Sequence, residues 1–156
     1  MPSVDLIKLI QENVLSLKPY IVEDIKCKIK LHANENPFPP SKELLGLFSE
    51  SLREIQLNRY PDPDSKKLKD SIANQLGTET ERLIIGNGSD EIILFILQVF
   101  CKEGDTIIFP DPTFAMYSII SKSLGIKPAS VSLDNHWDFS ADLLLRSANE
   151  NNSKII

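Results

Sequence analysis

The hydrophobic positions at the start of this chain follow helical spacing. Between residues 4 and 16 they recur every three to four residues, which predicts a helix. They are Leu6, Ile7, Leu9, Ile10 and Val14. Pro19 closes this segment, and residues 29–31 are predicted as a short strand.

Two proline-rich stretches separate the next predicted helices. Residues 34–41, NENPFPPS, hold three prolines in eight positions, and proline moves the residue before it away from helical angles. Ser41 is predicted to cap a helix that ends near Ile55. After a second loop, NRYPDPDS, Asp64 is predicted to cap another helix, and Gly77 to end it in the left-handed conformation.

From residue 82 onwards, short apolar runs alternate with amphipathic stretches. The predicted strands are residues 82–85, 105–109, 128–133 and a last one opening at 154; the predicted helices are 89–101, 113–124 and, more weakly, 140–147. Such alternation predicts the α/β class, with a largely parallel sheet and helices on its faces. Because the chain ends inside the last apolar run, we expect a truncated chain, a fragment, or a chain that needs a partner.

Composition narrows the class of protein. With 156 residues of which 42% are hydrophobic, the chain can bury a core. A net charge of −5 argues against a nucleic-acid surface, and the small basic cluster at Lys66, Lys67 and Lys69 is typical of a solvated helix face. No apolar run approaches the roughly 18 residues that span a membrane.

The cysteines and histidines of the chain predict no disulfide framework and no metal site. Cys27 and Cys101 lie far apart, which fits a reducing cytoplasm. His32 and His136 are too far apart in sequence to suggest a metal site. The N-terminal segment lacks the features of a signal peptide.

The most informative stretch is IIGNGSDEIILFILQVF, residues 84–100. A small-residue turn between a strand and a helix can present unpaired backbone N–H groups to a phosphate, and Ser89 or Asp90 is predicted to cap the helix. Glu91 replaces the third glycine of a dinucleotide fingerprint, and no lysine precedes Ser89, which excludes a nucleotide P-loop. Alone, such a turn is also typical of a plain strand–helix connection.

Two aromatic residues extend this candidate site. Phe114, in DPTFAMY, follows the next strand at the same edge of the sheet, and its ring could stack on a flat ligand or simply fill the core. Thr113 is predicted to cap the helix there. Tyr60, in RYPDP, could donate to a phosphate oxygen or be a half-buried loop residue.

Four motifs in this order, LHANENPFPP, LNRYPDPDS, IIGNGSDEII and FPDPTFAMY, resemble the pyridoxal-phosphate aminotransferases of fold type I. Within that group the chain is most similar to the histidinol-phosphate aminotransferases, from about Lys18 to its end. The combination of RYPDP, GNGSDE and PTFAMY is specific for this subgroup, whereas each motif alone is not.

The resemblance implies a role for each matching position. The turn at Gly88, with the backbone N–H groups of Ser89 and Asp90, would bind the phosphate of pyridoxal 5'-phosphate. Phe114 would stack on the pyridine ring, where the family often has tyrosine, and Tyr60 would reach the phosphate of the neighbouring subunit of a homodimer.

Three further positions are implied at the substrate. Tyr20 would contact the phosphorylated substrate, and Asn34 and Glu35 would line its entrance. Residues 1–40 would form an N-terminal arm and part of the small domain, and residues 41–156 the N-terminal part of the large, cofactor-binding domain.

The same resemblance implies transfer of an amino group from histidinol phosphate to 2-oxoglutarate, or in reverse from glutamate to imidazole acetol phosphate, the keto partner of histidinol phosphate, in cytoplasmic histidine biosynthesis. No catalytic residue is expected in this segment, because the family's Schiff-base lysine and the residues that grip the substrate carboxylate come later, so the isolated chain is expected to be inactive. Two alternatives stay open: another enzyme of the same fold, such as a threonine-phosphate decarboxylase or an aromatic aminotransferase, and a non-catalytic α/β binding or assembly module.

Overall fold

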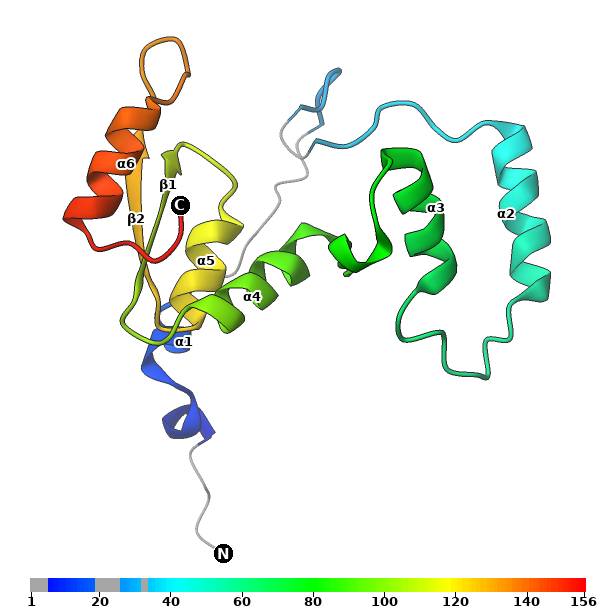
Figure 1. Ribbon diagram of the computed structural model, residues 1–156, viewed down its shortest axis with the longest axis horizontal. Helices are drawn as coiled ribbons and strands as arrows, with labels where there is room; N and C mark the ends of the chain where they lie inside the picture. The colour runs from blue at the N-terminus through cyan, green and yellow to red at the C-terminus, as the bar shows by residue number, and fades with distance from the viewer. Residues whose placement is uncertain (1–5, 19–25, 32–33) are drawn as a thin grey trace, which may run out of the picture. The chain divides into compact units, whose positions relative to one another are not determined.

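The computed structural model describes residues 6–18, 26–31 and 34–156. The chain forms two compact units, one of residues 1–19 and 81–156 and the other of residues 20–80. Figure 1 labels the helices and strands of both units.

A small parallel sheet forms the centre of the larger unit. Strand β1 (Thr106–Asp111) pairs with β2 (Lys127–Ser132) in a register that runs from Thr106 opposite Lys127 to Asp111 opposite Ser132. On the other side of β1, Ile155 forms a parallel bridge with Ile107, and the Ile108 amide donates to the Ile155 carbonyl at 3.0 Å. The apolar run at 154 therefore pairs with the sheet, and the predicted α/β class is confirmed.

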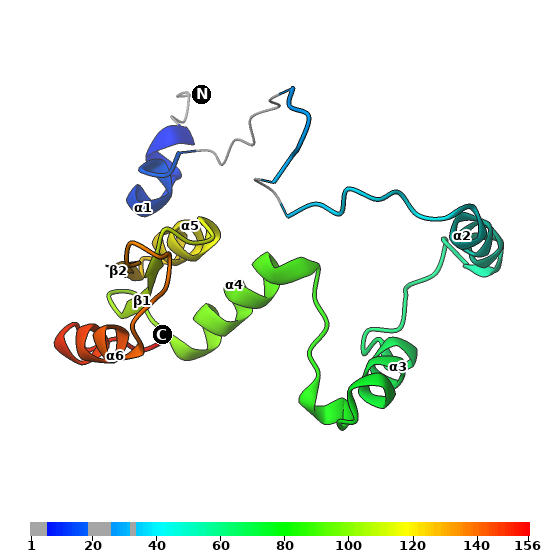
Figure 2. The ribbon, with the colours of Figure 1, turned by 90° about the horizontal axis from the view of Figure 1, so that it is seen from above.

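Successive residues of β1 face opposite sides of the sheet, so its two neighbouring isoleucines enter two different cores. Ile107 packs with Leu97 of α4 (Gly88–Phe100) and Ile120 of α5 (Met116–Ser123). Ile108, only 1% exposed, packs with Leu144 and Ala148 of α6 (Ala141–Glu150). The views in Figures 1 and 2 agree that α5 and α6 lie on opposite faces of the strands.

The N-terminal segment is less regular than its periodicity predicts. The expected helix over residues 4–16 is divided, within the described residues, into a 3-10 helix (Leu6–Leu9) and the short α1 (Glu12–Leu15). The side chain of Asn13 donates to the Ser123 carbonyl at 2.8 Å, so α1 is held at the carboxyl end of α5. Pro19, predicted to close this segment, lies outside the described residues.

The smaller unit contains α2 (Lys42–Glu54) and α3 (Lys66–Leu76). The Ser41 hydroxyl accepts from the Leu44 amide at 3.2 Å, which confirms the predicted cap. Gly77 ends α3 with φ +64°, as predicted for a left-handed cap. The strand predicted at residues 29–31 is wrong, since this stretch is irregular.

The strand predicted at residues 82–85 is also wrong. A 3-10 helix (Thr80–Arg82) precedes an irregular segment that leads into α4. A strand needs a neighbour to pair its backbone N–H and C=O groups, and within the described part of the chain no other segment pairs with residues 83–85. The apolar run alone was therefore a poor guide here.

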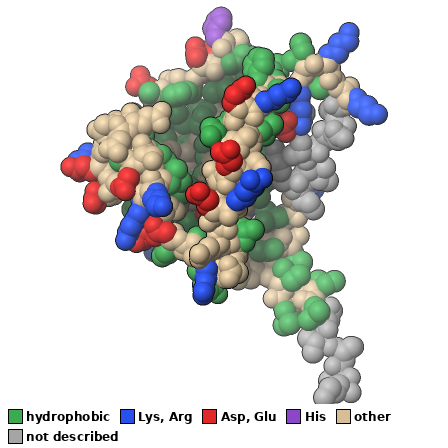
Figure 3. Space-filling model, turned by 90° about the vertical axis from the view of Figure 1, so that its right-hand side faces the viewer, with side chains coloured by type: hydrophobic (Ala, Val, Ile, Leu, Met, Phe, Trp, Pro, Cys, Tyr) green, Lys and Arg blue, Asp and Glu red, His purple; other side chains and the backbone are tan. Residues whose placement is uncertain are grey.

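Several helices leave apolar side chains uncovered. Half or more of Leu47 and Phe48 on α2, and of Val99 and Phe100 on α4, is exposed, and Figure 3 shows hydrophobic side chains at the surface. Exposed apolar surface on a helix is typical of faces that other polypeptide covers. No helix in the described ranges is long and apolar enough to cross a membrane.

Two adjacent leucines of α6 give a matched test of the second core. Leu144 packs against Ile108 and is 6% exposed, whereas Leu145 on the same helix is 55% exposed. We expect Leu144→Ala to lower the free energy of unfolding by about 2–5 kcal/mol, because it opens a cavity. Leu145→Ala should change it by less than about 1 kcal/mol. Denaturant unfolding of both variants checks this, and equal losses would contradict the assigned core.

Candidate functional site

The start of α4 is organised by backbone and side-chain hydrogen bonds of the glycine turn. The Asn87 amide donates to Glu91 Oε2 at 2.6 Å, and the Gly88 amide donates to the Gly86 carbonyl at 2.9 Å. The helix begins at Gly88 with Asn87 at the N-cap position. The prediction that Ser89 or Asp90 caps the helix is therefore wrong, because both lie inside its first turn and Glu91 reaches back instead.

This arrangement leaves the next two amides available. Ser89 and Asp90 are exposed, and among the described residues neither of their backbone N–H groups has a hydrogen-bond partner. First-turn N–H groups and the helix dipole together favour an anion. Since Asp90 and Glu91 place two carboxylates on the same turn, the attraction for a phosphate has to come from the amides.

Two glycines permit the turn. Gly88 has φ +79°, a conformation that side chains disfavour. A Cβ atom on Gly86 would lie 2.8 Å from Ile92 Cδ1 and 2.9 Å from Glu91 Oε2, so this glycine leaves room for the Glu91 carboxylate. The backbone therefore passes closely over the start of α4, as a ligand-binding turn requires.

Phe114 lies in the segment between β1 and α5 and remains 42% exposed. Its ring meets Tyr117 edge-on, with ring centroids 5.9 Å apart, and Tyr117 in turn contacts Phe109 at 5.9 Å. Edge-to-face contact is a favourable aromatic geometry, and it leaves the ring at the surface. The helix starts later than predicted, at Met116 with Ala115 at its N-cap position, so Thr113 does not cap it.

An apolar cavity of about 310 Å³ lies between α4, β1, α5 and the last residues of the chain. Thr113 and Tyr117, close neighbours of Phe114 in sequence, line it, and no residue of the 86–91 turn does. Neither the amides of Ser89 and Asp90 nor the ring of Phe114 lines this cavity. Their joint action at one ligand stays a prediction.

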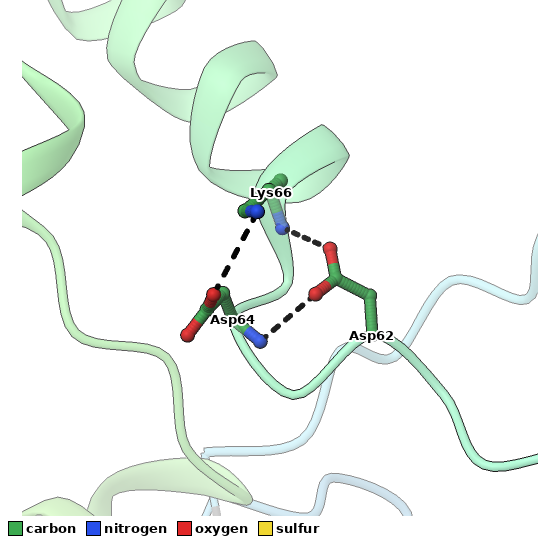
Figure 4. A network of polar contacts seen from close by, with 3 residues as sticks. All are labelled: Asp62, Asp64 and Lys66. Atoms are coloured by element: carbon green, nitrogen blue, oxygen red, sulfur yellow. Dashed lines mark hydrogen bonds and ion pairs between the residues drawn. The ribbon is translucent and has the colours of Figure 1, made fainter.

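Tyr60 belongs to the smaller unit and its side chain is fully exposed. It stands between two turns, one closed by the Arg59 amide on the Gln56 carbonyl at 2.9 Å and the other formed by Asp62. The Asp62 carboxylate accepts from the Asp64 amide at 3.0 Å and from the Lys66 amide at 2.9 Å (Figure 4).

The prediction that Asp64 caps α3 is therefore wrong. Asp62 fills this role, because it stands four residues before the first residue of the helix and its carboxylate accepts from the Lys66 amide. The Asp64 side chain forms an ion pair with Lys66 at 3.9 Å instead. Sequence reasoning missed Asp62, although an aspartate followed by proline is typical of such turns.

The predicted substrate residues are placed only in part. Asn34 is exposed, with a left-handed φ of +50°, and the Glu35 carboxylate pairs with Lys30 at 2.8 Å. Tyr20 lies outside the described residues. The part assigned to these three residues stays a prediction, as does a site they would share with Ser89 or Phe114.

Comparison with known proteins gives the family. The profile of aminotransferase class I and II matches residues 26–156. Histidinol-phosphate aminotransferase of Caldanaerobacter subterraneus subsp. tengcongensis is 34% identical over 148 residues, which are 95% of this chain and 42% of the relative. Histidinol-phosphate aminotransferase 2 of Nitrosococcus oceani is 40% identical over 135 residues, or 86% of this chain and 37% of the relative.

The fold agrees with these relatives. The crystal structure of histidinol-phosphate aminotransferase from Sinorhizobium meliloti in complex with pyridoxal-5'-phosphate superposes with a TM-score of 0.70 at 21% identity, over 78% of this chain and 32% of that chain. The chain belongs to the class I and II aminotransferases, a family of pyridoxal-phosphate-dependent enzymes. It spans less than half the length of these relatives.

The glycine at the start of α4 gives a test of the turn. In Gly88→Ala the new side chain meets no atom within 4 Å but keeps φ +79°, so we expect α4 to lose about 1–2 kcal/mol of local stability. Gly46→Ala within α2 is the control and should stabilise its helix by about 0.5–1 kcal/mol. Amide hydrogen exchange in the two helices measures both, and a stabilised α4 would contradict the described turn.

Asp62 predicts a pH dependence of the loop that carries Tyr60. The amides of Lys66 and then of Asp64 hold the pKa of the Asp62 carboxyl below its ordinary value. A lowered pKa in the folded state means that the cap is fully formed above the ordinary aspartate pKa and is lost as the pH falls through the lowered one.

The measurement is the backbone amide shift of Lys66 followed through acid by nuclear magnetic resonance. We expect one transition below the usual aspartate range, which Asp62→Asn removes. A transition that survives this substitution would show that another group holds the turn.

Proposed function

We propose that this chain carries the phosphate-binding and ring-stacking part of a pyridoxal-phosphate aminotransferase. The enzyme acts on histidinol phosphate, with 2-oxoglutarate as the other substrate and glutamate as the other product. The observation that carries the proposal is the pair of exposed, unpartnered amides of Ser89 and Asp90 within the described start of α4. Relatives named histidinol-phosphate aminotransferase, 34% and 40% identical to the chain, support the choice of substrate.

The residues present fit the cofactor. Two amides at the positive end of a thirteen-residue helix suit a phosphate dianion, and the exposed ring of Phe114 offers a flat apolar face for a pyridine ring. Gly88 lets the backbone approach the phosphate without a side chain in between. When bound, pyridoxal phosphate supplies an electron sink for the charge left when a substrate proton departs.

The remaining roles follow from the family. We assign to Tyr60 a hydrogen bond to the cofactor phosphate of a neighbouring subunit in a homodimer, and its full exposure supports a partner outside its own unit. Tyr20, Asn34 and Glu35 are assigned to substrate binding. A cytoplasmic place in histidine biosynthesis follows from the proposed substrate.

The chain alone is proposed to lack transaminase activity. It spans 42% of a curated relative's length, and none of its lysines stands in a sequence context like that of the family's Schiff-base lysine. The uncovered apolar surface of α2 and α4 supports packing against further polypeptide. We therefore place the catalytic lysine in a downstream part of a full-length protein, in which residues 1–40 begin the small domain and residues 41–156 the large one.

The fold by itself does not choose the substrate. The crystal structure of tyrosine aminotransferase from Leishmania infantum also superposes, with a TM-score of 0.56 at 24% identity over 72% of this chain. The hydrogen bonds that a site makes to its substrate, rather than its fold, decide between related substrates. An aromatic or phosphothreonine substrate therefore stays the alternative to be tested.

The test compares the 156-residue chain with the full-length protein. Each is mixed with pyridoxal phosphate and reduced with borohydride, and the modified residue is located by mass spectrometry. We expect trapping on a downstream lysine of the full-length protein, amino transfer from histidinol phosphate in preference to tyrosine, and no activity of the shorter chain.

Three results would contradict parts of the proposal. Specific trapping on a lysine within residues 1–156 would refute the inactivity of the chain. A full-length protein that binds no pyridoxal phosphate would favour a non-catalytic binding module. Preference for tyrosine or for threonine phosphate would keep the family but change the substrate.

A further inference from the structure

We propose that Asp62 is a positioning residue that fixes Tyr60 for contact with the cofactor phosphate. This inference rests on the proposed function, in which Tyr60 donates to that phosphate. Asp62 itself is assigned no contact with cofactor or substrate. Its effect is transmitted to Tyr60 through the backbone of Pro61, the one residue between them.

Three oxygen atoms of Asp62 accept hydrogen bonds that stabilise the turn. Its two carboxylate oxygens accept from the amides of Asp64 and Lys66 at 3.0 and 2.9 Å (Figure 4). Its carbonyl accepts from the Ser65 amide at 3.2 Å. One residue therefore ties the loop to the first turn of α3, and hydrogen bonds to an ionised group are stronger than neutral ones.

Among the described residues, the Tyr60 side chain is not held in place by contacts of its own. Its side chain is fully exposed, and within the described parts of the chain it makes no hydrogen bond or ring contact. Its place is set by the Gln56–Arg59 turn on one side and by Pro61 and the Asp62 turn on the other. Because only Pro61, whose φ angle is fixed by its ring, stands between Tyr60 and Asp62, an ordered Asp62 turn limits the directions that Tyr60 can take.

Fixing a binding group in advance strengthens binding, because less freedom is lost when the ligand arrives. Without the Asp62 turn, the Tyr60 hydroxyl would have to be ordered by the phosphate itself. The expected loss is therefore specific for the phosphate group and dependent on Tyr60. A general loss of stability would show neither property.

Asp64 is the matched control. It lies two residues away, carries the same charge, and its carboxylate accepts no backbone N–H among the hydrogen bonds of the described loop. Its ion pair with Lys66, at 3.9 Å between exposed side chains, contributes little in water. Asp64→Ala thus makes the same change in charge and leaves the turn intact.

The experiment is a double-mutant cycle in the full-length protein. Dissociation constants are measured for pyridoxal phosphate and for pyridoxal, which lacks the phosphate, with Tyr60→Phe, Asp62→Ala, the double variant and Asp64→Ala. We expect Tyr60→Phe and Asp62→Ala each to weaken binding of pyridoxal phosphate about tenfold, the size of one hydrogen bond to a charged group.

The double variant should also bind pyridoxal phosphate only about tenfold more weakly than the wild type, since both substitutions remove the same interaction. Pyridoxal binding and the Asp64→Ala variant should be unchanged. Asp62→Asn, which keeps one acceptor oxygen, should recover part of the affinity and serves where Asp62→Ala does not fold.

The possible failures are distinguishable. If the wild-type protein binds no pyridoxal phosphate, or Tyr60→Phe has no phosphate-specific effect, the proposed function of Tyr60 fails, and the role of Asp62 fails with it. Tyr60→Phe can behave as expected while only the role of Asp62 is overturned. This is the case if Asp62→Ala binds pyridoxal phosphate like the wild type or weakens the binding of pyridoxal phosphate and pyridoxal equally. It is also the case if the double variant binds pyridoxal phosphate about a hundredfold more weakly, because the two effects are then independent.

Discussion

The pairing of backbone amides at helix starts is the constraint on which this account depends. An α-helix leaves its first N–H groups without partners, and three helices here meet that need with a side chain. Ser41 serves α2, Asp62 serves α3 and Ser140 serves α6. At α4 the Glu91 carboxylate instead binds the amide of Asn87, so the amides of Ser89 and Asp90 remain available for an anion.

The parallel sheet supplies the second element of the proposed site. β1 pairs with β2 along one edge and with the segment around Ile155 along the other. Helices cover both of its faces, with α4 and α5 on one and α6 on the other. The chain leaves β1 at the edge where ligands of open α/β sheets bind. Phe114 follows directly and keeps an exposed ring, held by edge-on contact with Tyr117.

Local signals in the sequence predicted much of this structure. The periodicity of α4 and α6, the Ser41 cap and the left-handed Gly77 depend on neighbours within a few residues, and all are confirmed. The prediction of a strand at residues 82–85 failed because pairing depends on a distant partner. The caps predicted at α3 and α4 failed because the acids that bind amides there, Asp62 and Glu91, lie four residues away from their partners Lys66 and Asn87.

Site residues were harder to predict than elements. Sequence motifs pointed to Ser89, Asp90 and Phe114, and the structure leaves these groups exposed, but exposure alone does not say which ligand they bind. Asp62 escaped notice because its effect is exerted on the backbone and through it on Tyr60.

The central claim is that the Ser89 and Asp90 amides bind the cofactor phosphate, and the most direct measurement observes them. Their ¹H–¹⁵N resonances are followed in the full-length protein during titration with pyridoxal phosphate and, separately, with pyridoxal. The account predicts large downfield shifts of both amides with pyridoxal phosphate and not with pyridoxal. Amides that stay unmoved while the cofactor binds elsewhere would contradict it.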